Sequence, residues 1–147
     1  MGDTATSSDR LFHRRGKVVC VAEIKNRSCT KAFIEERGSY LISANKIDDG
    51  IALSRLLHVP FWIYAYLGGS DTLASFQIVD AAGMPRTAFT RQMTRTRATC
   101  NGGEAVRENC FLRFGDMQVV PVSIRNWTAT KVRNALRKSD PLILPVV

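Results

Sequence analysis

The stretch Lys17–Lys25, which reads KVVCVAEIK, decides the fold that we predict for this chain. Its composition is that of a β-strand, in which successive side chains point to opposite faces. One face is wholly apolar and should be buried: Val18, Cys20, Ala22 and Ile24. The other face begins apolar and ends on an acid and a base: Val19, Val21, Glu23 and Lys25. Buried charges are costly unless they are paired or bind a metal, so this strand end is the first candidate site. The alternative is a solvated strand end with a weak surface ion pair.

Length and charge limit the class of protein. A chain of 147 residues that is 45% hydrophobic is expected to form a single domain over residues 1–147. Its formal net charge of +8 makes nucleic acid the first expected partner and an anionic membrane surface the second, against a basic domain with neither. No apolar run approaches the roughly 20 residues of a membrane span, and the N-terminus has no secretory signal.

The location that we expect is therefore the cytoplasm, or the host cytoplasm if the chain is viral. The four cysteines do not have the short spacing of structural zinc sites, so we expect them to be reduced.

A hairpin precedes the first stretch. Residues 8–13 alternate enough to form a short strand, and Arg14–Lys17 reads as its turn, with Gly16 at a positive φ. A three-residue loop would place Asp9 directly opposite Glu23, whereas a two-residue loop would place Ala22 there. Two facing carboxylates repel each other, so the first register would imply a cation between them.

The rest of the chain alternates short strands and helices. The predicted strands are Ser39–Ser43, Phe61–Leu67 (buried on both faces), Leu73–Asp80, Cys110–Phe114 and Met117–Val122. The segment Lys31–Arg37 is expected to be a short helical or irregular connection that Gly38 ends. The predicted helices are Ala44–Leu57 and a basic helix Lys131–Lys138 before the apolar tail Pro141–Val147. We identify no helix or strand in residues 81–109, which are polar, basic and poor in periodicity.

The order of these elements resembles the PD-(D/E)XK nuclease superfamily, the fold of restriction-type endonucleases and Holliday-junction resolvases. Asp9 would match the family's first acid, Ala22–Lys25 its (D/E)-x-K strand, and Ser43–Lys46 its polar position at a helix start. The resemblance covers about residues 8–80, with additional strands and the basic helix in residues 81–147. It implies an α/β fold with a mixed central β-sheet flanked by helices. We expect the helix that normally opens this core to be missing, because eight residues precede Asp9.

The resemblance, which extends to phage nucleases, implies a phage-like, metal-dependent endonuclease that hydrolyses DNA phosphodiester bonds. Asp9, Glu23 and the Ile24 carbonyl would hold Mg²⁺ or Mn²⁺, with Asp3 as a competing first acid. Lys25 would position or deprotonate the attacking water, and Lys46 would hold a phosphate at the N-terminus of its helix.

Basic residues elsewhere are candidates for contacts with the nucleic-acid backbone, although each can also be an ordinary solvated cation. These candidates are Arg14, Arg15, Arg91, Arg95, Lys131 and Arg137. Asp48 and Asp49 complement the helix dipole and need no functional role. We expect a homodimer that binds DNA. The alternatives are a non-catalytic nucleic-acid-binding or assembly protein of the same fold, and a nuclease toxin domain acting on tRNA or DNA.

Overall fold

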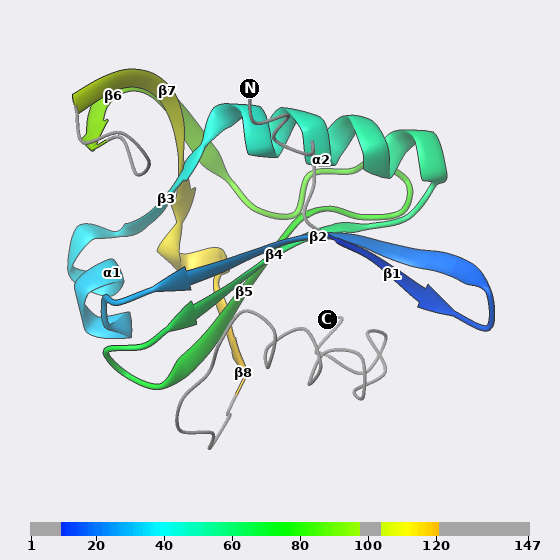
Figure 1. Cartoon of the computed structure of the whole chain (residues 1–147), viewed down its shortest axis with the longest axis horizontal. Coiled ribbons are helices and arrows are strands. Elements are labelled where there is room, and N and C mark those ends of the chain that lie inside the picture. The colour runs from blue at the N-terminus through cyan, green and yellow to red at the C-terminus, as the bar shows by residue number, and fades with distance from the viewer. Residues whose placement is uncertain (1–9, 98–103, 121–147) are drawn as a thin grey trace, which may run out of the picture.

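The computed structural model describes residues 10–97 and 104–120, which form a mixed α/β domain (Figure 1). The strands are β1 (Arg10–Arg14), β2 (Lys17–Arg27), β3 (Ser39–Ser43), β4 (Phe61–Leu67), β5 (Thr72–Val79), β6 (Phe89–Arg97), β7 (Glu104–Arg113) and β8 (Gln118–Val120). The helices are α1 (Lys31–Arg37) and α2 (Ala44–Leu57), and a 3₁₀ turn, η1, spans Phe114–Asp116. The predictions for Lys131–Lys138 and Pro141–Val147 lie outside the described residues.

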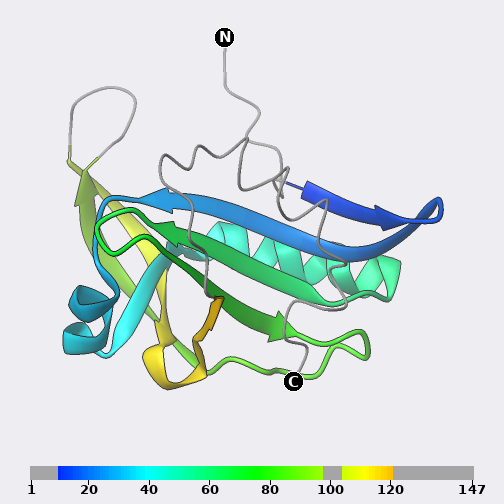
Figure 2. The same ribbon diagram turned by 90° about the horizontal axis from the view of Figure 1, so that it is seen from below.

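The strands form two sheets rather than one central sheet. The larger sheet has the order β1-β2-β4-β5-β8, and the smaller has the order β3-β7-β6. Among the strand pairs of residues 10–97 and 104–120, only β2–β4 is parallel, and the chain makes this crossover through α1, β3 and α2. In Figure 2 α2 lies behind β2 and β4, so it covers one face of the larger sheet. The α/β class is therefore confirmed, but β3 belongs to the second sheet and not to the central one.

Local sequence explains where the two helices begin and end. The Thr30 hydroxyl accepts a hydrogen bond from the Phe33 amide (3.1 Å) at the start of α1, and Gly38 ends this helix at a φ of 72°. The C-cap of α2 is His58, also in the left-handed region at a φ of 55°. Because β3 ends at Ser43 and α2 begins at the next residue, the start of α2 is held directly at the sheet.

The hairpin of β1 and β2 contains a bulge that changes the predicted faces. Arg14 pairs with Lys17 around a two-residue turn, yet Phe12 pairs with Cys20, so β2 has one extra residue at Val19. Val18 consequently packs with the cluster beneath α2 and Val19 with the opposite cluster. The predicted faces are thus wrong for these two valines, and they are right from Cys20 onward.

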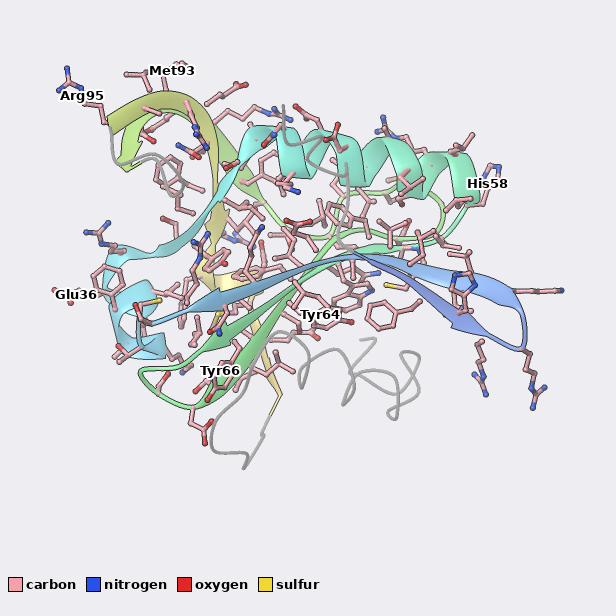
Figure 3. All side chains as sticks on the ribbon, viewed as in Figure 1. Glu36, His58, Tyr64, Tyr66, Met93 and Arg95 are labelled. Carbon is pink, nitrogen blue, oxygen red and sulfur yellow. The ribbon has the colours of Figure 1, made fainter. Side chains whose placement is uncertain are left out.

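The main core lies between the larger sheet and the layer formed by α2, β3 and β7. All seven side chains of β4 are buried, as predicted for a central strand. They alternate, so that Phe61 and Ile63 face α2, whereas Tyr64 and Tyr66 lie on the other side of the sheet, below it in Figure 3. This alternation fixes the face of each neighbouring β2 residue, because Glu23 pairs with Ile63.

The reading of residues 81–109 as irregular is wrong, since they contain β6 and more than half of β7. The sequence of β6, FTRQMTRTR, has polar side chains on both faces of the strand. Hydrophobic alternation marks a strand only where one face is buried. This ribbon is mostly exposed, so it lacks that signal.

Candidate functional site

Glu23 is the buried charge around which the candidate site is built. Its side chain is 1% exposed and lies on the face of β2 that α2 covers. Lys25 Nζ lies 2.5 Å from Glu23 Oε1, and Lys46 Nζ lies 3.5 Å from the same oxygen. The side chains of Lys25 and Lys46 keep 26% and 17% exposure. The structure thus brings together three of the four residues predicted to be catalytic, and the fourth, Asp9, lies outside the described residues, as does Asp3.

The two lysines reach Glu23 from different elements. Lys25 follows on the same face of β2, two residues on, and Lys46 is the third residue of α2. A helix start carries a partial positive charge from its aligned peptide dipoles. The Ser43 side chain makes no cap hydrogen bond there. Three sources of positive potential therefore converge on one carboxylate.

The backbone of β2 presents a second oxygen at this place. The Val21 amide donates to the Pro60 carbonyl, and the Arg27 carbonyl accepts from the Gly68 amide, so odd-numbered residues point their backbone groups toward β4. The Ile24 carbonyl therefore points toward the β1 edge. The last described pair on that edge joins Arg10 to Ala22, which is the register expected of the three-residue loop. The bulge at Val19 restores that register after a two-residue turn.

These donors suit a hard divalent cation. The Glu23 carboxylate and the Ile24 carbonyl supply oxygen only, which is the donor type that Mg²⁺ prefers. Residues 10–97 and 104–120 contain no cluster of three or more His, Cys, Asp or Glu side chains. The described part of the chain therefore supplies two of the three predicted ligands.

Arg27 extends the basic face beyond the motif. It shares the face of Glu23 and Lys25, and its Nε donates to the Tyr40 hydroxyl at 3.3 Å. Burial raises the pKa of Tyr40, while the nearby Arg27 lowers it. The sequence reading missed Arg27 because it ended the strand at Lys25; continued alternation would have found it.

The predicted nucleic-acid contacts lie at two ends of the domain. Arg14 and Arg15 are exposed at the β1–β2 turn, and Arg95 is exposed on β6. Arg91 makes a two-pronged pair with Asp48, with distances of 2.5 and 3.1 Å. Hydrogen bonding by Arg91 lowers the pKa of Asp48. The predicted role of Asp48 at the helix dipole is therefore wrong, because α2 begins at Ala44 and its first turn contains no acidic residue; Arg91 is the partner of Asp48 instead. Lys131 and Arg137 lie outside the described residues.

A hollow of about 410 Å³ lies away from Glu23, between Gly38 and Ser39 and the β6 residues Phe89, Thr90 and Gln92.

Neither of the helices in the described ranges has the length and apolar character to cross a membrane. Comparisons with protein-family models, with curated proteins and with solved structures found no match to this chain.

Proposed function

We propose that this protein is a metal-dependent endonuclease that hydrolyses phosphodiester bonds of DNA, with a fold of the PD-(D/E)XK type. The observation that carries the proposal is the burial of Glu23 between Lys25 and Lys46, where β2 meets the start of α2. The order of elements around it supports the family, because a hairpin leads into β2 and a helix leads from there to the parallel strand β4.

Fold stability gives little reason to bury this carboxylate. A buried ion pair can often be replaced by apolar side chains of similar volume without loss of stability. The neighbours of Glu23 on this face of the sheet, Val21 and Ile63, show that an apolar side chain would fit the layer. A buried acid held by two bases is typical of sites where the charge is needed for chemistry.

The residues have separable roles in the proposed reaction. Glu23 and the Ile24 carbonyl would hold Mg²⁺ or Mn²⁺, together with Asp9. Such a metal, when bound, neutralises phosphate charge and supplies a nucleophilic water near neutral pH. Lys25 would orient that water and stabilise the negative charge that develops on the phosphate. Lys46 would bind a phosphate oxygen, helped by the dipole of α2.

The experiment is a cleavage assay on supercoiled, linear, single-stranded and branched DNA and on RNA, with Mn²⁺, with Mg²⁺ and with EDTA. Cleavage of DNA that requires a metal and is lost in Lys25→Ala supports the proposal. The matched control is Lys31→Ala, since Lys31 belongs to an exposed pair with Glu35 at 3.9 Å. Failure to cut any substrate, or cutting that Lys25→Ala leaves intact, would contradict the proposal.

A non-catalytic nucleic-acid-binding protein is the second candidate. It is favoured by the formal net charge of +8, which suits binding to a polyanion whether or not the polyanion is cut. It predicts metal-independent DNA binding without cleavage in the same assay.

A further inference from the structure

The two-stranded ribbon of β6 and β7 is a second basic feature of the molecule. Its strands pair without a break from Phe89–Leu112 to Arg97–Glu104. β6 is an edge strand of the smaller sheet. In Figure 1 the ribbon curves up and away from the larger sheet, beyond the start of α2. We call the described strand segments Arg91–Arg97 and Glu104–Asn109 the arm.

One face of the arm combines apolar and basic side chains. Met93 is 65% exposed and Val106 is 61% exposed. Arg95 lies directly opposite Val106 and is two residues from Met93, so the three side chains share this face. Figure 3 shows Met93 and Arg95 at the margin of the molecule, pointing outward. Apolar side chains gathered beside an arginine on an edge strand are features of an interaction surface.

Charge indicates which partner this surface suits. Arg95 and Arg107 are exposed on the strands of the arm, whereas Glu108 lies 3.9 Å from Arg91. Arg107 is exposed on the other face of the ribbon, opposite Thr94. A ribbon with arginines on both faces is complementary to a polyanion that surrounds it, such as the two phosphate backbones that flank a groove.

The base of the arm is fixed to the candidate site. Arg91 joins β6 to Asp48 of α2, two residues after Lys46. Within the arm the Asn109 side-chain amide donates to the Thr94 hydroxyl at 2.6 Å, and Asn109 itself is 1% exposed. A ligand held by the arm is therefore held at a defined place relative to the start of α2.

We propose that the arm inserts into the major groove of double-stranded DNA. This groove is about 12 Å wide and admits a two-stranded β-ribbon. There Arg95 and Arg107 would contact phosphates or guanine edges, and Met93 and Val106 would contact thymine methyl groups. The major groove of duplex RNA is deep and too narrow for side chains to read. The inference rests on the proposed function for the claim that nucleic acid reaches α2, and it specifies the substrate as duplex DNA.

The test measures binding of the full chain carrying Glu23→Gln, so that cleavage does not interfere. Fluorescence anisotropy would compare labelled 20-base-pair duplexes of DNA and RNA of one sequence, as well as the single DNA strand. The variant is Met93→Ser with Arg95→Ala. Its matched control is Leu56→Ser with Arg55→Ala, since Leu56 is a 74% exposed apolar residue beside an exposed arginine on α2.

We expect the arm variant to weaken duplex DNA binding by about tenfold or more, and the control to change it by less than about twofold. Arg95→Ala alone should reduce the slope of log affinity against log salt by about one. Duplex RNA should bind more weakly than duplex DNA.

Three results would overturn the inference. The first is that the protein does not bind duplex DNA, and the second is that the arm variant and the control variant bind duplex DNA with equal affinity. The third is that the protein binds the RNA and DNA duplexes with equal affinity. A change from dimer to monomer with unchanged DNA affinity, seen by sedimentation, would show that a second copy of the chain occupies the arm instead. Arm-dependent binding without any cleavage by the wild-type chain would leave the arm in place and contradict the nuclease. DNA cleavage that the arm substitutions leave unchanged would support the nuclease and contradict the role of the arm.

Discussion

Glu23 and its two lysines should contribute unequally to stability, because only Glu23 is fully buried. At an effective dielectric constant near 20, the attraction is about 7 kcal/mol for Lys25 Nζ at 2.5 Å and about 5 kcal/mol for Lys46 Nζ at 3.5 Å. Desolvation of the carboxylate offsets most of this gross attraction. What remains depends on which charge is left behind when a partner is removed.

Replacing both lysines by methionine leaves a carboxylate that is 1% exposed without these two cations. We expect the free energy of unfolding to fall by about 3–5 kcal/mol, as for other buried pairs that lose one side. Glu23→Gln instead leaves two lysines that retain 26% and 17% exposure and can extend to water. This variant should change the free energy by less than about 1 kcal/mol, in either direction.

Urea unfolding followed by circular dichroism measures both values, and equal m-values would show that the two variants unfold from comparable states. The triple variant Glu23→Leu, Lys25→Met, Lys46→Met should recover stability near that of the wild type while losing activity. A loss of stability in Glu23→Gln as large as that of the double lysine variant would contradict this expectation. The carboxylate would then be a structural anchor of the sheet.

Three further predictions concern the helix, the arm and the thiols. A Cβ at Gly50 would lie 2.1 Å from the Phe61 ring, so Gly50→Ala should destabilise the fold by about 1–3 kcal/mol although alanine has the better helix propensity. Combining Gly50→Ala with Phe61→Leu should cost less than the sum of the two single changes. Additive losses in urea unfolding would contradict the close contact. Because the pKa of Asp48 is lowered, its contribution to stability is present above the ordinary pKa of about 4 and is lost as the pH falls further. Asp48→Asn should therefore reduce the loss of stability at acid pH. An unchanged dependence of stability on acid pH would argue against the Arg91 pair. Burial raises the pKa of Cys20 to about 12. At pH 8 maleimide should therefore label the half-buried Cys29 of the native protein but not Cys20, as measured by peptide mass spectrometry. Rapid labelling of Cys20 would contradict its burial.

The sequence predicted the elements whose pattern reports burial. The run Phe61–Leu67 is apolar on both faces and is a central strand. Gly38 ends α1 in the left-handed conformation that favours glycine. Two charges at the end of an otherwise apolar stretch identify the Glu23–Lys25 pair. The predicted helix start identifies Lys46, and in the structure Lys46 lies at Glu23.

The features that sequence did not reveal depend on long-range pairing. The bulge at Val19 is invisible because apolar residues flank it and either face accepts a valine. The arm has polar residues on both faces, so no periodicity marks it. The Asp48–Arg91 pair joins residues 43 positions apart, and nothing in the local sequence of either residue indicates the other.

The most direct test of the account is the rate of supercoiled DNA cleavage in Mn²⁺ by wild-type protein and by Glu23→Gln, each shown to be folded by circular dichroism. Glu35→Gln, at an exposed acid of α1, is the control. We predict that wild type and Glu35→Gln cut at similar rates and that Glu23→Gln is slower by about a hundredfold or more. Equal rates for Glu23→Gln and wild type, or no cleavage by the wild-type chain, would contradict the assignment of Glu23 as the centre of a nuclease site.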